Sequence, residues 1–336
     1  MSGWIALSDR DTPLAPMPAG ALLDRGALVL ELALPLEGPT VLLDYHATDG
    51  WARGLSVFHD PQAGFGILHR QGQVVIRHTL PTPLPRDGGT ARLTLCWDAP
   101  ARRWTMHAEL PATGWSARSQ GRNPLPLPMA DLLALCAGGG PATRHPALLW
   151  FGATLGDTPP NRAPWIGLRT PVAVPGGHAP AGSLRAGDVV LTADSGPQPL
   201  RSVRRMDLPS RGSFAPVLLR APYFARTADL LVSGDQLIAL AGYQVEYLFG
   251  EDEVLAEARH MADGRSALFD NRRACTACIS LELPEPGLIL SDGCALASAR
   301  HTPEANAEAL PRRQLHVYET LPLLALLGRG ALHRAA

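Results

Sequence analysis

The chain has 336 residues, of which 46% are hydrophobic and 18% charged, and its formal net charge is −1. This composition indicates a folded globular protein and excludes a disordered one. Because the charge is nearly balanced, there is no basic field to attract nucleic acid, and no segment approaches the roughly 20 apolar residues that span a bilayer. The length allows two domains, each with its own core.

The N-terminus and the cysteines favour a reducing compartment. Residues 1–10 lack a basic segment followed by an apolar run, so no ordinary secretory signal is expected. The five cysteines are odd in number and irregularly spaced, unlike a disulfide framework. We therefore expect a cytoplasmic protein without a cofactor, and signal-independent secretion remains the open alternative.

Short strands joined by turns fill the first half of the chain. Gly and Pro number 33 and 32, which is typical of a chain with many turns. Strands are predicted at residues 27–34, 40–45, 55–59, 65–69, 73–80, 91–97, 104–109 and 147–152, and one short helix at 129–136. Strands at this spacing favour a jelly-roll-like β-sandwich over residues 1–158.

One hairpin in this half, at residues 93–109, carries a family resemblance. Trp97 and Asp98 enter its turn, and Trp104 leaves it. The hairpin and the surrounding strands resemble the sandwich of concanavalin A-like lectins and glucanases over residues 20–155. The resemblance implies a unit that binds a partner, either a glycan or a protein that the sequence does not identify.

A Pro-rich segment at residues 156–164 separates this half from a second run of strands. Strands are predicted at 172–174, 188–192, 216–220, 229–232, 244–249, 278–282 and 287–290. The tail at 311–336 is predicted to be partly helical, around 323–332. The whole chain is therefore expected to be mainly β, with a second all-β domain at 165–310 followed by a short C-terminal helix.

Three segments of the second half carry a second family resemblance. The first is residues 182–201, where Gly187 and Asp188 make the turn into a strand. The second comprises residues 229–238, 243–254 and 258–261, and the third residues 279–293. Together they resemble the Hedgehog/intein (Hint) domain of bacterial proteins, whose order they follow over roughly 130 residues. Three ordered blocks arise by chance far less often than one.

The resemblance also implies a self-cleavage site whose residues have been replaced. An active Hint domain begins when a Cys, Ser or Thr attacks the preceding carbonyl, and a His protonates the departing nitrogen. The nucleophile position falls on Trp165 and the His position on Gln236. A downstream Asp and His fall on Pro284 and Pro286. We therefore expect a degenerate site without a catalytic residue.

Four remaining residues are weaker candidates. Thr170 is the nearest downstream hydroxyl, and His260 matches a family position, although a lone His is more often packed or exposed. Cys275 and Cys278 form a single CxxC, which Cys294 and His260 would complete as a zinc site. A chance pair near a strand start explains the CxxC better, so no metal is expected.

In the first half, Asp44, Trp51 and Asp60 are candidates for a sugar site, because carboxylates and aromatic faces suit sugar hydroxyls and rings. Loop and core roles would explain the same residues. Asp98 and Glu109 would be the carboxylate pair of a glycosidase. Strand ends and solvated faces account without metal for five histidines: His46, His59, His69, His78 and His107.

Three functions compete. The first is a non-catalytic protein whose Hint-like domain is a scaffold or binding module. The second is an autoprocessing enzyme with unusual residues such as Thr170, and the third is a glycan hydrolase centred on the first domain. Trp165 and Gln236 count against autoprocessing. A glycan hydrolase is disfavoured because the sequence lacks the acidic motif of concanavalin A-like hydrolases, such as Glu-x-Asp-x-x-Glu, whose carboxylates two apart on a strand would share a face. The sequence therefore predicts the first function, with enzyme activity not expected.

Overall fold

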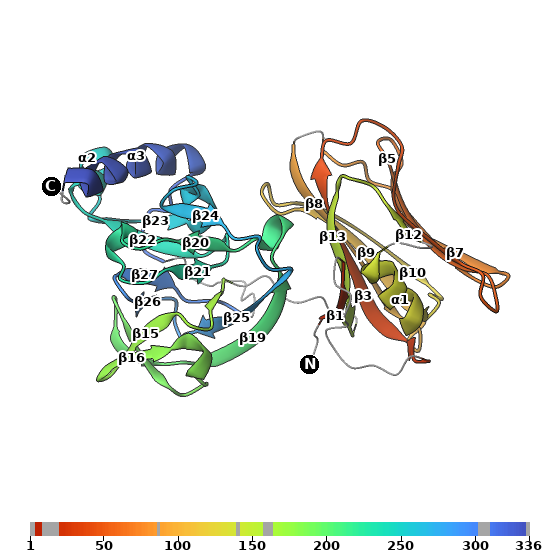
Figure 1. The fold of residues 1–336 in the computed structure, drawn as a ribbon, viewed down its shortest axis with the longest axis horizontal. Helices are drawn as coiled ribbons and strands as arrows, with labels where there is room; N and C mark the ends of the chain where they lie inside the picture. Colours follow the sequence, from red (N-terminus) through yellow and green to blue (C-terminus); the bar gives the residue numbers. More distant parts are fainter. Residues whose placement is uncertain are drawn as a thin grey trace. The chain divides into compact units, whose positions relative to one another are not determined.

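The computed structural model describes residues 4–8, 20–85, 88–138, 142–156, 164–301 and 310–333. Part of the predicted boundary at 156–164 lies outside the described residues. Contacts along the chain divide it into two units, coloured in sequence order in Figure 1. The sandwich unit is Met1–Pro160 with Arg211–Ser213, and the second unit is Asn161–Ser210 with Phe214–Ala336.

The sandwich unit is built from two antiparallel sheets. The six-stranded sheet has the order β1 (Trp4–Leu7), β13 (Leu148–Leu155), β3 (Arg25–Leu34), β8 (Gly89–Asp98), β9 (Arg103–Leu110) and β10 (Trp115–Arg122). The five-stranded sheet has the order β12 (Ala142–Arg144), β4 (Thr40–Ala47), β5 (Arg53–Asp60), β6 (Gly64–Gln71) and β7 (Val74–Leu80). The predicted sandwich is thus confirmed.

Alternation of apolar and polar side chains places one face of each sheet in a shared core. In β9, Trp104, Met106 and Ala108 are buried while the residues between them are partly exposed. Leucines of β3 and β8 meet side chains of β4, β5 and β6 in the same cluster. This core is what the period-two pattern of the sequence specifies, because a strand turns alternate side chains to opposite faces.

Tight turns fix the register of the strands. Gly64 opens β6 with φ +82°, and a Cβ atom there would lie 2.2 Å from the carbonyl oxygen of Leu80. Only glycine fits this position without strain. The predicted hairpin at 93–109 is present, with Asp98 opposite Arg103 in the register of β8 and β9.

Helix α1 (Met129–Ala137) lies between the sheets at one end of the sandwich and packs against β1, β13 and β11 (Leu127–Pro128), which pairs with β2 (Leu22–Leu23). Its predicted span was 129–136, so the helix is confirmed. Leu132 and Leu135 are buried on its inner face together with Asp131. A carboxylate on the apolar face of a helix requires a partner, and that partner defines one of the sites below.

The second unit contains two six-stranded sheets and a hairpin. One sheet has the order β19 (Ser202–Pro209), β25 (Cys275–Glu282), β14 (Ile166–Gly167), β21 (Leu230–Val232), β20 (Val217–Leu219) and β24 (Ala267–Phe269). The other has β18 (Gly196–Pro199), β17 (Val189–Thr192), β26 (Leu288–Ser291), β27 (Cys294–Ala297), β22 (Leu237–Ala241) and β23 (Glu253–Glu257). The hairpin joins β15 (Pro171–Val174) and β16 (Gly177–Pro180).

One predicted strand, at residues 244–249, is wrong. These residues form helix α2 (Tyr243–Phe249), which begins after Gly242 and ends at Gly250 in the left-handed conformation. Val245 is buried and Leu248 and Phe249 are partly buried, a spacing of three and four that suits a helix face. The β-branched and aromatic residues favour a strand locally, but the flanking glycines and the packing of this face decide otherwise.

The C-terminal segment forms α3 (Val317–His333), longer than predicted, with Pro322 inside its first turns. Leu323 and Leu324 are buried in the core of the second unit, and α3 lies beside α2 (Figure 1). Among the described residues, no helix has the length and apolar character needed to cross a membrane.

Candidate functional site

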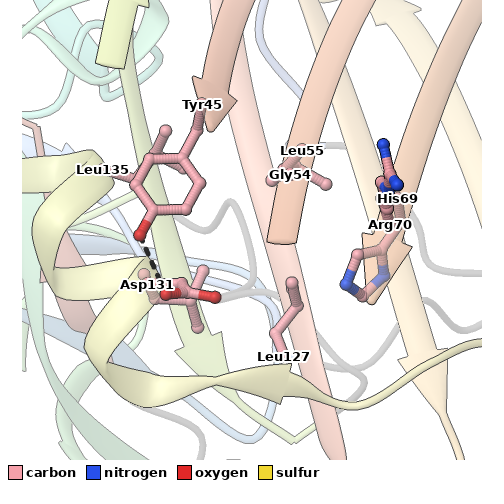
Figure 2. A pocket seen from close by; sticks show the side chains of 9 residues that line it. Tyr45, Gly54, Leu55, His69, Arg70, Leu127, Asp131 and Leu135 are labelled. Carbon is pink, nitrogen blue, oxygen red and sulfur yellow. Dashed lines mark hydrogen bonds between the residues drawn. The ribbon is translucent and has the colours of Figure 1, made fainter. Parts of the chain in front are cut away.

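In the sandwich unit, the polar side chain of α1 meets residues from two strands. Asp131 accepts a hydrogen bond from the hydroxyl of Tyr45 at 2.8 Å and pairs with Arg53 Nε at 2.9 Å. Burial is the main cause that raises the pKa of Tyr45 to about 12, and the hydrogen bond to Asp131 is the next largest. Figure 2 shows Tyr45 and Asp131 at the wall of a small pocket that His69 also lines. The three residues come from β4, β5 and α1, so no local sequence pattern indicates that they meet.

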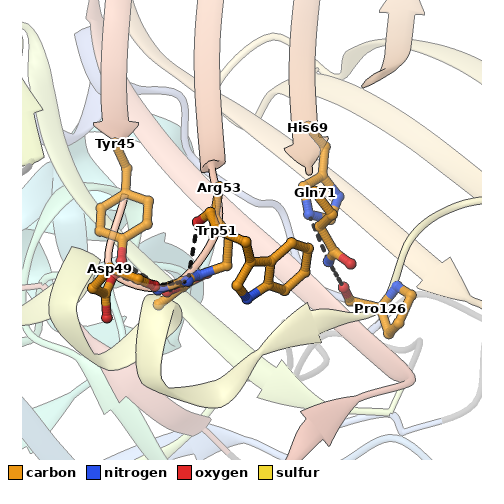
Figure 3. A network of polar contacts seen from close by, with 8 residues as sticks. Tyr45, Asp49, Trp51, Arg53, His69, Gln71 and Pro126 are labelled. Atoms are coloured by element: carbon orange, nitrogen blue, oxygen red, sulfur yellow. Dashed lines mark hydrogen bonds and ion pairs between the residues drawn. The ribbon is translucent and has the colours of Figure 1, made fainter. Parts of the chain in front are cut away.

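The same arginine supports the turn between β4 and β5. Arg53 donates to Asp49 at 2.8 Å, and its guanidinium lies 5.5 Å from the ring centroid of Trp51. Trp51 itself is 45% exposed. Figure 3 shows the turn with Arg53 between Tyr45 and the indole. The arrangement presents an aromatic face to solvent on a turn that an ion pair holds in place.

The three predicted sugar-site residues are not brought together. Trp51 precedes β5 and Asp60 ends it, so they lie at opposite ends of an eight-residue strand, roughly 25 Å apart at 3.3 Å per residue. Asp60 accepts backbone hydrogen bonds from Gln62 and Ala63 and caps its own turn. Asp44, in the middle of β4, accepts a hydrogen bond from Ser56 at 2.5 Å. Trp51 is the most exposed of the three, and both carboxylates are engaged in hydrogen bonds of their own.

The expectation that the five histidines occupy strand ends and solvated faces is wrong for three of them. His59, His69 and His78 are buried, at 4%, 4% and 1% exposure. Their strands face the other sheet at these positions, and period-two alternation alone cannot say which face is the inner one. Nor do Asp98 and Glu109 form a carboxylate pair, because they lie at opposite ends of the β8–β9 hairpin and pair with Arg25 and Arg92.

In the second unit, residues 164–165 lead into the central strand β14. Ile166 pairs with Val232 on one side and with Ile279 on the other. Trp165 is 3% exposed. Its amide nitrogen lies 3.2 Å from the hydroxyl of Ser233, and its carbonyl accepts from the Ser233 amide at 2.9 Å. Trp165 directly precedes β14, and these two contacts hold it against Ser233, which directly follows β21.

Trp165 and Gln236 line one small cavity, together with Pro164, Ile279, Leu281 and Ala297. Gln236 is 2% exposed, and its amide nitrogen donates to the carbonyls of Leu237 at 3.1 Å and Ala297 at 2.9 Å. Both hydrogens of that nitrogen are therefore engaged by the backbone. A neutral amide in this position holds two segments together and has no proton to transfer near neutral pH.

A second set of polar side chains, which the sequence did not reveal, contacts the peptide bond between Pro164 and Trp165, here called the junction. Ser280 donates to the carbonyl oxygen of Pro164 at 2.7 Å. His301 Nε2 is 2.9 Å from the Ser280 hydroxyl, and His301 Nδ1 is 3.1 Å from Glu282 and 2.8 Å from Ser202. We call Ser280, His301 and Glu282 the junction relay.

The junction relay is buried, with Ser280 at 0%, His301 at 4% and Glu282 at 8% exposure. Burial lowers the pKa of His301, Arg204 adds to this effect, and Glu282 opposes it. Ser280 and Glu282 are two apart on β25 and so share a face, the one sequence signal that could have pointed to them. His301 reaches them across 21 residues of chain, a proximity that only folding creates.

Comparison with known sequences identifies this unit. The family model described as "Hint domain" matches residues 168–303. These residues form a Hint domain. No curated protein matches the chain.

Solved structures with similarity to the chain are distant. They include tailspike protein 2 of the Escherichia coli O157:H7 bacteriophage CAB120, at 13% identity over 41% of this chain and TM-score 0.23. Basic winged bean lectin with Tn-antigen has 13% identity over 47% and TM-score 0.20, and the laminin α2 LG1–3 region has 8% over 90% and TM-score 0.27. The chain spans 18%, 68% and 57% of these chains, respectively.

Within the Hint domain, the two remaining family positions are not at the cavity. Pro284 and Pro286 are exposed in the loop between β25 and β26. Thr170 is 4% exposed, its amide donates to Gly167, and its carbonyl accepts from Ala181. His260 lies in the short helix Ala258–Met261, where burial lowers its pKa. None of the four lines the cavity beside Trp165.

The CxxC of the Hint domain does not form a chelating pair. Cys275 and Cys278 are three apart on β25, so their side chains leave opposite faces of the strand. Burial raises the pKa of Cys278 well above its ordinary value, which disfavours the thiolate that binds metal. Cys294 lies on another sheet. Within the described ranges, no three His, Cys, Asp or Glu side chains are grouped as metal ligands.

Proposed function

We propose that this Hint domain is a scaffold that does not cleave the chain at the Pro164–Trp165 peptide bond. The observation that carries the proposal is Trp165 itself, 3% exposed at the position where the family resemblance calls for a nucleophile. An indole has no thiol or hydroxyl to attack the preceding carbonyl, so the first step of self-cleavage has no nucleophile.

The second step also lacks its group. A departing amide nitrogen must gain a proton, and the family position for that acid is Gln236, whose amide is engaged by two backbone carbonyls. Thr170 does not replace Trp165, because it is buried in a different turn and lines no part of the cavity. Neither family position therefore carries a residue that can perform its step, and the fold remains as a support.

The test is the intact mass of the purified full-length chain after prolonged incubation at neutral pH, with and without a thiol nucleophile. We expect a single species at 35.8 kDa in both samples. Trp165→Phe, which keeps a buried aromatic ring, serves as the matched variant and should behave identically. Two fragments that meet between residues 163 and 170 would overturn the proposal, and Thr170→Val would then show whether Thr170 is the nucleophile.

A second candidate function concerns the sandwich unit, as a module that binds a glycan through Trp51. The observation that favours it is the exposed indole of Trp51, on a turn that the Arg53–Asp49 ion pair stabilises. Sugar rings stack on exposed aromatic faces. A protein partner is the alternative occupant.

Glycan-array binding of the full chain tests this second candidate. Trp51→Ala is expected to weaken any binding at least ~10-fold, as removal of an aromatic anchor does, without changing the melting temperature. Val75→Ala removes another exposed apolar side chain of the same sheet, 57% exposed, and should leave binding unchanged. Equal binding by both variants would exclude Trp51 as the contact.

A further inference from the structure

The carbonyl of Pro164 has a donor that the family resemblance did not assign. Ser280 Oγ lies 2.7 Å from the carbonyl oxygen, and His301 Nε2 lies 2.9 Å from Ser280 Oγ. On the other side of the ring, the Ser202 hydroxyl lies 2.8 Å from Nδ1 and donates to it, and Glu282 accepts the His301 backbone amide at 3.2 Å. A serine, a histidine and a carboxylate are thus aligned on one peptide carbonyl.

We infer that Ser280, oriented by His301 and Glu282, is an oxyanion-type donor to Pro164, so that the junction keeps a polarised carbonyl after losing its nucleophile. The inference rests on the proposed function, because it concerns the same peptide bond. Ser280 touches the carbonyl oxygen itself, whereas His301 and Glu282 are positioning residues.

Counting protons gives the direction of the relay. A carbonyl oxygen only accepts, so the one hydroxyl hydrogen of Ser280 points to Pro164. The Ser280 oxygen must then accept from His301, which places a hydrogen on Nε2. Each donor strengthens the next, because chains of hydrogen bonds polarise one another in a buried site. Charge that develops on the Pro164 oxygen would therefore be stabilised without rearrangement.

This arrangement predicts that a thiol is what the junction chiefly lacks. In Trp165→Cys, the sulfur would form a bond to the Pro164 carbonyl carbon, and the carbonyl π electrons would move to the oxygen facing Ser280. Collapse would break the carbon–nitrogen bond and give a thioester. The thiol proton ends on the freed amine, so the step is an isomerisation that needs no further reactant, and Ser233 Oγ, 3.2 Å from that nitrogen, is within reach to pass the proton.

The first experiment uses the native residue at the junction. Pro164–Trp165 is the one Pro–Trp pair in the sequence, so labelling proline carbonyls with ¹³C and tryptophan amides with ¹⁵N gives a single HNCO peak for this bond. Ser280→Ala is expected to move that carbonyl resonance upfield, since the carbonyl loses its donor. Ser280→Thr keeps a hydroxyl and should restore the position.

Ser210→Ala is the matched control for this experiment, because Ser210 is also fully buried in the Hint domain but bonds to Thr276 instead. It should leave the peak in place. An unmoved peak in Ser280→Ala, or equal movement in Ser210→Ala, would overturn the inference.

The second experiment measures chemistry. Trp165→Cys in the full chain, treated with hydroxylamine, is expected to yield fragments 1–164 and 165–336, and adding Ser280→Ala should slow this about 100-fold, as loss of an oxyanion donor does. Trp165→Ala, equally small but without a thiol, should stay intact. Cleavage at equal rates with and without Ser280, or no cleavage of a folded Trp165→Cys chain, would contradict the inference. Cleavage of the unaltered chain would instead contradict the proposed function, so the two failures are distinguishable.

Discussion

Lowering the pH from about 7 to about 4 is expected to destabilise the sandwich unit by up to about 6 kcal/mol, because two of its buried histidines resist protonation. Burial lowers the pKa of both His69 and His78 from 6.5 to about 4, and for His69 the neighbouring His78 adds to the effect. At 1.36 kcal/mol per unit, each shift corresponds to roughly 3 kcal/mol.

The surroundings of both rings favour the neutral form. The Gln71 amide lies 3.2 Å from His69 Nε2 and also donates to the carbonyl of Pro126, so Nε2 accepts and carries no proton (Figure 3). The ring of His78 packs edge-on against Trp104 at 4.7 Å between centroids. In the part of the chain that the structure describes, no carboxylate near either ring offsets a positive charge there.

The sign of the effect follows from where the protons bind. Between pH 6.5 and about 4, the unfolded chain binds protons at these histidines and the folded chain does not. The free energy of unfolding is therefore at its full value above pH 6.5 and falls as the pH decreases towards 4. Burial lowers the pKa of His59 as well, so a third histidine acts in the same direction.

Urea unfolding at a series of pH values, followed by tryptophan fluorescence, measures this dependence. Six of the seven tryptophans belong to the sandwich unit, so the signal reports mainly on it. The variants His69→Gln and His78→Gln should each flatten the pH profile, whereas His178→Gln, at an exposed position of the Hint domain, should not. If the free energy of unfolding of the unaltered chain stayed constant between pH 7 and 4, folding would not lower the pKa of either histidine, and the prediction would be wrong.

Asp131→Ala is expected to destabilise the sandwich unit by about 3–5 kcal/mol, as removal of one partner from a buried ion pair does. The side chains of Arg53 and Asp131 are only 10% and 9% exposed. Without the carboxylate, the guanidinium loses its buried partner and keeps only the exposed Asp49, and the Tyr45 hydroxyl loses its acceptor. The link between α1 and the five-stranded sheet would be lost with them.

Asp49→Ala provides a matched control, because Asp49 is the other carboxylate that pairs with Arg53. The Asp49 side chain is 83% exposed. Water replaces such a partner, so little change is expected. The double variant Tyr45→Phe/Asp131→Ala should be less damaging than the sum of its parts, since the hydroxyl that needs the carboxylate is also gone. Equal unfolding free energies for Asp131→Ala and Asp49→Ala would show that the buried pair contributes no more than the exposed one.

Local chemistry determined most of the secondary structure of this protein. Alternating strands such as β7 and β9, and the turns at Gly187 and Asp194, follow from side-chain period and turn preference. Strand β10 escaped prediction because its residues are polar or partly exposed throughout, so it has no apolar alternation to detect. Helix α2 was mistaken for a strand because its composition and its flanking glycines point in opposite directions.

By itself, the sequence determined the two-part organisation of strands, the order of the Hint blocks and the presence of an indole where a nucleophile is expected. Each of these features depends on residues close together in the sequence. Only the tertiary structure decided which histidines are buried, that Asp131 meets Tyr45 and Arg53, and that Ser280 and His301 converge on Pro164. These contacts join residues up to 116 positions apart, and the energy of each depends on burial that no local pattern specifies.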